Sequence, residues 1–170
     1  MTTTDEHGNA ALHLAALLNP NEKVIKYLIE QGADRNAPGQ FKRTPFPCAV
    51  KQNPNLAICK LLYRNESDLT ARDEHGNTAL HLAALLNPNE EIVRFLIEQG
   101  ADRKARGARS MTPFHLAVKR NPNLKICKLL YKDASDLMAA DRSGRTALDH
   151  VQTNSNPEIV AFVEAMANVK

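Results

Sequence analysis

The stretch HLAALLNPNEEIVRFLIEQGAD, residues 81–102, is nearly a copy of HLAALLNPNEKVIKYLIEQGAD, residues 13–34. The copies lie 68 residues apart, but the underlying period is half that distance. One position recurs every 34 residues, at Ala10, Thr44, Thr78, Thr112 and Thr146. The chain therefore consists of five units in one domain, residues 1–170. We expect the units, called units 1 to 5 below, at about residues 5–38, 39–72, 73–106, 107–140 and 141–170.

Composition and cysteine content narrow the class of protein. The 170 residues are 43% apolar and 24% charged, which is typical of a globular chain. No run approaches the roughly 18 apolar residues of a membrane span, and the opening MTTTDEHGN lacks the features of a secretory signal. The three cysteines, Cys48, Cys59 and Cys127, form no metal-type pair, and an odd number argues against a disulfide framework. We expect action in the cytoplasm or the nucleus, with reduced thiols and no membrane contact.

Each unit carries the signals of two short helices. In units 2 to 5 a threonine stands where an N-cap belongs, and Pro45 and Pro113 follow at the first helical position, where a missing N–H costs nothing. The motif NPN then ends the first helix, and Asn89 is placed to cap the second. In the odd units Gly32 and Gly100 are placed to close the second helix. The roughly 14 polar residues that remain before the next threonine suit an extended β-turn finger.

Helix, turn, helix and finger at a period near 33 resemble the ankyrin repeat. The segment DEHGNTALHLAALLNPNEEIVRFLIEQGADRKA follows the family pattern from D-x-x-G-x-T through H-L-A-A to G-A-D. The resemblance covers residues 5 to about 166 and implies an all-α repeat solenoid of paired antiparallel helices with β-turn fingers. Most units depart from the pattern by one extra residue at the NPN turn. Even units have Glu66 or Ala134 instead of the closing glycine, and Pro47 and Asp149 replace the usual histidine.

Recurring histidines and cysteines favour structural roles. His13, His81 and His115 occupy one position of the helix-start motif, which predicts a hydrogen bond that steadies the turn. Metal ligands would have to converge on one point, whereas these residues are spaced along the stack. Cys59 and Cys127 share a position that is aliphatic in the odd units, so we expect both to be buried. We predict no metal site.

The sequence contains no catalytic or nucleotide-binding motif of the G-x-G-x-x-G, G-x-x-x-x-G-K-[ST], H-E-x-x-H or G-x-S-x-G type. A stack of repeats also forms no deep pocket by construction. We therefore expect a binding protein that is not an enzyme and needs no cofactor. Asn36, eight residues after Leu28, resembles the asparagine that a protein hydroxylase modifies in some ankyrin repeats, which makes it a candidate modification site.

Charge is distributed unevenly between the units. Residues 103–132 contain nine Lys or Arg and no acid, and residues 35–65 contain six and no acid. One explanation is that basic second helices lie beside acidic ones, Arg64 near Glu30 and Lys132 near Glu98, in exposed ion pairs worth about 0–1 kcal/mol. The other is a basic surface in units 2 and 4 that steers an acidic partner.

The resemblance to ankyrin proteins implies a binding surface formed by the fingers and the first helices on the concave side. The expected finger contacts are His7, Asn9, Phe41, Arg43, His75, Asn77, Arg109, Met111 and Arg145. The expected contacts at first-helix ends are Leu18, Lys51, Gln52, Leu86, Lys119 and Arg120.

Phe41 and Met111 are apolar where a solvated finger would be polar. An apolar centre with a basic rim indicates a groove for a protein partner. The alternative is binding of nucleic acid or another polyanion through the basic patch of unit 4, which the scarcity of aromatic residues for base stacking disfavours. The first unit has no obvious cap, which leaves open self-association through that end.

Overall fold

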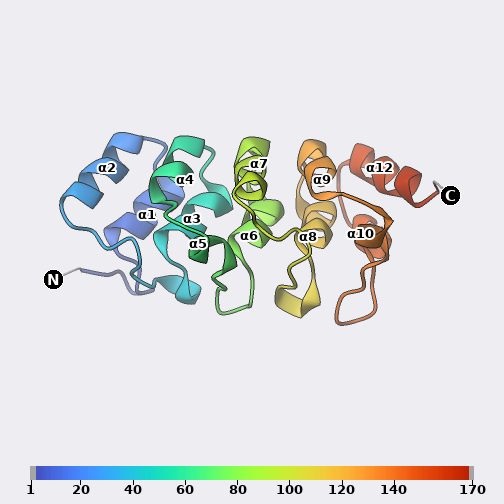
Figure 1. Cartoon of the computed structure of the whole chain (residues 1–170), viewed down its shortest axis with the longest axis horizontal. Coiled ribbons are helices and arrows are strands. Elements are labelled where there is room, and N and C mark those ends of the chain that lie inside the picture. Colours follow the sequence, from blue (N-terminus) through green and yellow to red (C-terminus); the bar gives the residue numbers. More distant parts are fainter. Residues whose placement is uncertain (1–2, 169–170) are drawn as a thin grey trace.

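The computed structural model describes residues 3–168, which form a single row of stacked helix pairs (Figure 1). The first helices of the units are α1 (Ala11–Leu18), α3 (Pro45–Gln52), α6 (Ala79–Leu86), α8 (Pro113–Arg120) and α11 (Ala147–Val151). The second helices are α2 (Glu22–Glu30), α4 (Leu56–Leu62), α7 (Glu90–Glu98), α9 (Leu124–Leu130) and α12 (Pro157–Ala167). Residues 3–168 contain no sheet, so the all-α solenoid is confirmed.

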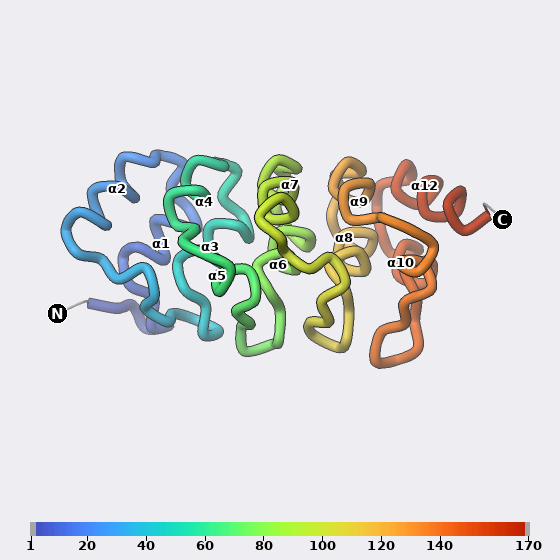
Figure 2. Tube along the Cα trace, viewed as in Figure 1, coloured from blue at the N-terminus to red at the C-terminus, as the bar shows by residue number. Residues whose placement is uncertain are grey.

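The chain passes along the stack without crossing itself. Figure 2 shows the two ends of the trace at opposite ends of the row, with the fingers projecting from one side. Each first helix packs mainly on the first helices of the neighbouring units, and each second helix covers its own first helix. The fingers and the first helices are thereby repeated along one side of the molecule.

Local signals place the helix ends where the sequence predicted them. Thr112 begins α8, and its hydroxyl oxygen accepts the N–H of His115 at 3.4 Å. The second helices begin at asparagines whose side-chain oxygens accept the N–H two residues later, as in Asn89 at 2.9 Å. Gly32 and Gly100 follow α2 and α7 with φ of 83° and 99°, a left-handed conformation that glycine adopts without strain.

The even units differ from the predicted finger. A short extra helix follows the second helix in each, α5 (Ser67–Thr70) and α10 (Ala134–Met138). No glycine reverses the chain there, and Asn65 and Asp133 instead accept the N–H groups of Ser67 and Ser135 as caps of a new turn. The segment between second helix and finger is therefore partly helical in units 2 and 4.

Asparagines of the NPN turns join each unit to the one before it. Asn87 Nδ2 donates to the carbonyls of Val50 and Asn53, at 2.9 and 3.1 Å, and Asn89 Nδ2 donates to the carbonyl of Pro54 at 2.8 Å. The same contacts recur at every junction, through Asn53 and Asn55, Asn121 and Asn123, and Asn154 and Asn156. We call this set the asparagine ladder. It satisfies carbonyls that a helix end leaves unpaired.

The core runs continuously through the units. Tyr63 lies between Phe46 and Phe95, with ring centroids 5.6 and 5.5 Å away. Cys59 and Cys127 are fully buried, as predicted, and burial raises the pKa of each thiol to about 12.

We predict that Asn87→Ala destabilises the fold by about 1–3 kcal/mol, because two buried carbonyls of unit 2 lose their donor. Asn19→Ala is the matched control. Asn19 also accepts a backbone N–H two residues later, yet residues 3–168 hold no preceding unit to which its amide could donate. Urea unfolding measures both variants, and equal losses would contradict the assigned role of the ladder.

Thiol reactivity tests the burial of the cysteines. We expect a thiol reagent to modify Cys59 and Cys127 slowly in the native protein and rapidly in denaturant, because a buried thiol of raised pKa is hardly ionised. Cys48, which lines a surface hollow and has a pKa raised to about 11, should react before them. Mass spectrometry of labelled peptides gives the order, and equal rates at all three positions in the native state would refute it.

Candidate functional site

The recurring histidines hold the fingers against the first helices. His81 Nδ1 accepts the N–H of Thr78 at 3.2 Å, so its Nε2 carries the proton and donates to the carbonyl of Met111 at 3.1 Å. His115 makes the equivalent bonds with Thr112 and the carbonyl of Ala139. The structural role predicted for these histidines is confirmed.

Two of the predicted finger contacts are wrong. Met111 is 4% exposed, and its carbonyl accepts hydrogen bonds from His81 Nε2 at 3.1 Å and from the N–H of Gly107 at 2.8 Å. Arg43 is also buried, and its Nη2 lies 2.6 Å from Oδ2 of Asp73 in the next finger. The residue just before the N-cap threonine is drawn into the stack, so neither side chain can form the centre of a binding surface.

Two further finger residues, both asparagines, tie neighbouring fingers together. Asn9 Oδ1 accepts the N–H of Gln40 at 2.9 Å, and Asn77 Oδ1 accepts the N–H of Ala108 at 3.0 Å. Both side chains are half-buried. They contribute to the spacing of the fingers more than to an open contact surface.

The finger tips themselves remain open. His7, His75 and Arg109 are exposed, and Phe41 is half-buried with its ring centroid 5.2 Å from that of His75. Phe41 and Arg109 have positive φ, 59° and 54°, which is uncommon for residues with side chains. Their carbonyls accept N–H groups of the following finger, Glu74 and Arg142, at 2.9 and 2.8 Å. The turn is therefore held by the neighbouring finger.

At the ends of the first helices, leucines of the odd units alternate with polar or basic residues of the even units. Leu18 and Leu86 are exposed at the ends of α1 and α6, as predicted. The even units place Gln52 and Arg120 at the same position, both exposed. One residue earlier the side chains are half-buried, in the order Leu17, Lys51, Leu85 and Lys119. Sequence reasoning missed Leu17 and Leu85, although the paired leucines signalled them.

Three arginines of units 4 and 5 act electrostatically on Lys119. Burial and the nearby charges of Arg145, Arg120 and Arg109 lower the pKa of Lys119. Among residues 3–168, only one of these four side chains has an acidic partner within 4 Å. Arg145 Nη2 lies 3.5 Å from Oδ2 of Asp141. We call Arg109, Lys119, Arg120 and Arg145 the basic cluster. They lie on the finger of unit 4, at the end of α8 and on the finger of unit 5.

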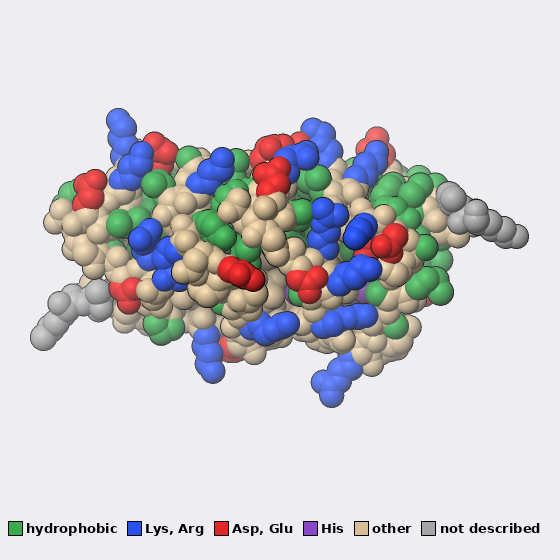
Figure 3. Space-filling model, viewed as in Figure 1, with side chains coloured by type: hydrophobic (Ala, Val, Ile, Leu, Met, Phe, Trp, Pro, Cys, Tyr) green, Lys and Arg blue, Asp and Glu red, His purple; other side chains and the backbone are tan. Residues whose placement is uncertain are grey.

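Cations of the second helices are partly neutralised, but not by the predicted acids. Lys125 lies 2.8 Å from Glu90 of the preceding unit, and Arg64 lies 2.6 Å from Asp68 of its own unit. Within residues 3–168 neither Glu30 nor Glu98 forms the expected ion pair. On the face that carries the second helices, basic side chains near α9 are interspersed with acidic ones (Figure 3).

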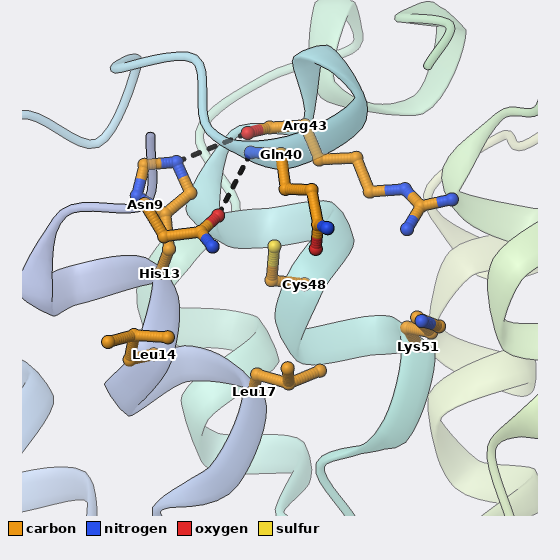
Figure 4. A pocket seen from close by; sticks show the side chains of 8 residues that line it. All are labelled: Asn9, His13, Leu14, Leu17, Gln40, Arg43, Cys48 and Lys51. Carbon is orange, nitrogen blue, oxygen red and sulfur yellow. Dashed lines mark hydrogen bonds between the residues drawn. The ribbon is translucent and has the colours of Figure 1, made fainter. Parts of the chain in front are cut away.

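The described residues form several hollows, including two open ones of about 310 and 320 Å³ beside Lys104. Figure 4 shows one of about 50 Å³ between units 1 and 2, where Leu14, Leu17 and Cys48 lie below Gln40 and Lys51 stands at the edge. Pockets for small molecules usually measure about 300–1,000 Å³. The hollow in Figure 4 is far smaller than that range. We call the surface between the fingers and the first-helix ends the groove.

Comparison with known families identifies this architecture. A family model described as ankyrin repeats (3 copies) matches residues 12–107 and again residues 89–169. The chain belongs to the ankyrin-repeat family. Ankyrin repeats are generally protein–protein interaction modules and typically have no enzymatic activity. A search of curated proteins returned no match.

Two searches within the ankyrin stack, over residues 3–168, gave no site of another kind. No three His, Cys, Asp or Glu side chains are grouped so that they could hold a metal ion. No helix in that range has the length and apolar character needed to cross a membrane.

The buried histidine of ankyrin unit 3 makes stability depend on pH. Burial lowers the pKa of His81 from its ordinary 6.5 to about 4, so the unfolded chain takes up the proton first as the pH falls. The stabilisation is complete above pH 6.5 and is lost as the pH falls towards 4, by up to about 3 kcal/mol. Urea unfolding at several pH values measures this slope.

His81→Gln should flatten the pH dependence between about pH 6.5 and 4, whatever its effect on stability at neutral pH. His7→Gln, on an exposed finger tip, is the control. An unchanged slope in His81→Gln would show that other groups cause the loss at acid pH.

Proposed function

We propose that the groove binds a protein partner through an apolar centre and a basic rim. The observation that supports this most strongly is the alternation along the first helices. Exposed Leu18 and Leu86 are separated by Lys51 and Gln52 of unit 2, and Lys119 and Arg120 of unit 4 follow Leu86. An apolar centre excludes water and supplies binding energy, whereas the rim stays hydrated. The partner segment is therefore apolar in its middle and acidic at one end.

The basic cluster orients the partner. The charges of three arginines act on Lys119 and lower its pKa, and the charge of Asp141 opposes them only in part, which leaves a positive potential at this end of the groove. An acidic residue of the partner would relieve that repulsion. Since the cluster lies at units 4 and 5, the acidic end of the partner lies over the fourth finger.

The finger tips form the side of the groove opposite the first-helix ends. Phe41 stacks on His75 and lies 4.9 Å from the guanidinium carbon of Arg43, which pairs with Asp73. An aromatic side chain supported in this way presents a firm edge and loses little entropy on binding. We therefore retain Phe41 as a contact residue and replace Met111 by Leu86 as the apolar centre.

Leu86→Ser should speed dissociation of the partner about tenfold, because the change removes apolar contact formed only in the complex. Arg109→Glu combined with Lys119→Glu should mainly slow association and flatten its salt dependence. Lys23→Glu combined with Lys26→Glu, on exposed α2, changes net charge equally and leaves the groove intact. The partner is first captured by a photo-crosslinking residue at position 86, and binding of the purified partner is then followed by surface plasmon resonance.

Mixed-sequence DNA and RNA serve as the competing ligands. Weak binding that vanishes by about 0.2 M salt is the attraction shown by any basic patch. Micromolar or tighter binding at physiological salt, lost in Arg109→Glu and unaffected by Leu86→Ser, would favour a nucleic-acid function and contradict the protein groove.

A further inference from the structure

A buried aspartate closes the finger turn in units 3 and 5. Oδ1 of Asp73 accepts the backbone N–H groups of the residues two and four positions later, at 3.0 and 2.9 Å. Oδ1 of Asp141 accepts the equivalent N–H groups at 2.7 and 3.1 Å. In both units one carboxylate oxygen holds the turn, which leaves the second oxygen, Oδ2, for a side-chain partner.

The two units differ in what binds Oδ2. Nε and Nη2 of Arg43, from the preceding finger, lie 3.0 and 2.6 Å from Oδ2 of Asp73. Met111 stands at the position of Arg43 in unit 4, so that position supplies no guanidinium to unit 5. Nε2 of His150, on α11, donates to Oδ2 of Asp141 instead, at 2.9 Å. We call the two pairs the finger clamps of units 3 and 5.

The clamp of unit 5 is formed by an exchange at two positions. The other four units have no histidine at the position of His150, where they carry Leu14, Cys48, Leu82 and Leu116. The side chains of Asp141 and His150 are 0% and 2% exposed. Since a buried carboxylate is costly without a partner, the histidine compensates for the arginine that unit 4 lacks.

The exchange replaces a permanent charge by one that depends on pH. Arginine stays protonated in proteins, whereas histidine gains its charge between about pH 8 and 5. Although burial raises it, hydrogen bonds from the N–H groups of Arg145 and Ser143 and from His150 lower the pKa of Asp141 to about 2. Asp141 therefore stays ionised, and the clamp of unit 5 is negative with neutral His150 and uncharged once His150 is protonated. The clamp of unit 3 is uncharged throughout this range.

The proton has a place to bind. Nε2 of His150 already carries the hydrogen that it donates to Asp141, so a second proton adds at Nδ1. Nδ1 has no hydrogen-bond partner among residues 3–168. No side-chain nitrogen or oxygen in that range is both fully buried and unpaired, so Nδ1 reaches solvent.

The groups around His150 do not change charge with it. The ring centroid of His115, on α8, lies 5.6 Å away, and burial followed by the charge of His150 lowers the pKa of His115, which keeps it neutral. Hydrogen bonds from Thr146 lower the pKa of Asp149, and Arg145 is permanently charged. The acids of the other helices packed on α11 are Asp136 of α10, which binds two backbone N–H groups, and exposed Glu158 and Glu164 of α12.

Asp141 also acts on the basic cluster. Its Oδ2 lies 3.5 Å from Nη2 of Arg145, and its charge opposes the effect of the arginines on the pKa of Lys119. The finger that it closes is bound to the finger of unit 4, because the N–H of Arg142 donates to the carbonyl of Arg109 at 2.8 Å. The charge of the clamp therefore contributes to the potential at the basic end of the groove.

We propose that the clamp formed by Asp141 and His150 is a pH switch, which strengthens the attraction of the groove for an acidic partner as His150 takes up a proton. Protonation cancels the negative charge that Asp141 otherwise contributes beside the basic cluster. The clamp of Arg43 and Asp73 has no such response. The effect on a partner rests on the proposed function of the groove, whereas the response of the clamp does not.

Backbone amide resonances test the clamp without a partner. The N–H groups of Ser143 and Arg145 donate to Asp141, so their ¹H and ¹⁵N chemical shifts report the charge of the pair. We expect both signals of the unchanged protein to move between about pH 7.5 and 5. Met111→Arg combined with His150→Leu copies the clamp of unit 3 and should hold them constant.

His150→Gln gives a second variant of the clamp, because glutamine keeps a neutral donor for Asp141 and cannot titrate. The two amide signals should stay constant in this variant as well. Movement as large as in the unchanged protein, in either variant, would overturn the proposal. Signals of the unchanged protein that do not move with pH would also overturn it.

An octaglutamate peptide labelled with tetramethylrhodamine tests the effect on the groove by fluorescence anisotropy. Its side chains stay ionised at about pH 8 and 6. Between these values the gain in affinity should be about two- to fivefold larger for the unchanged protein than for Met111→Arg combined with His150→Leu, as expected of one added charge. Exposed His7 and His75 gain charge in both proteins, so the comparison isolates the clamp.

Arg109→Glu combined with Lys119→Glu should abolish peptide binding, which places the peptide on the basic cluster. Equal gains in affinity for the unchanged protein and the clamp variant would overturn the regulation of the groove, even where the amide signals respond. A peptide that does not bind the unchanged protein at low salt would contradict the basic rim of the proposed function and its regulation together. The amide signals would then still decide whether the clamp responds to pH.

Discussion

The structure depends on the amide of one asparagine in each NPN turn. A first helix ends with carbonyls that have no partner in their own helix, and the asparagine of the next unit donates to two of them at 2.9–3.1 Å. Because a buried carbonyl without a donor is costly, units can stack in only one register. That register brings each finger beside the next and places the first-helix ends in line.

Finger residues differ in whether their side chain or their main chain contacts the next finger. The side chains of Arg43 and Asn77 bind the next finger, and Phe41 contacts it through its carbonyl and its ring, whereas Arg109 binds it through its carbonyl. A residue that contributes its backbone leaves its side chain open to solvent. The contact surface of the groove therefore includes finger residues that hold the next finger through their carbonyls. Leucines and cations of the first helices complete it.

Both ends of the described stack expose apolar side chains. In unit 5, Leu148 is 39% exposed, and Gln152 and Glu164 are exposed as well. Unit 1 keeps Leu14 and Tyr27 where unit 3 buries their counterparts. An inner unit contacts neighbours on both sides, and these contacts stabilise a repeat protein.

The sequence by itself determined the period, the helix ends, the structural histidines and the burial of Cys59 and Cys127, because caps, turns and apolar spacing act within a few residues. Only the tertiary structure decided that Met111 is buried, that Arg43 pairs with Asp73, and that the charges of three arginines act on Lys119. Those outcomes depend on how far one finger lies from the next and on which carbonyls need donors. Such distances follow from the stacking of units and not from the residues of any single unit.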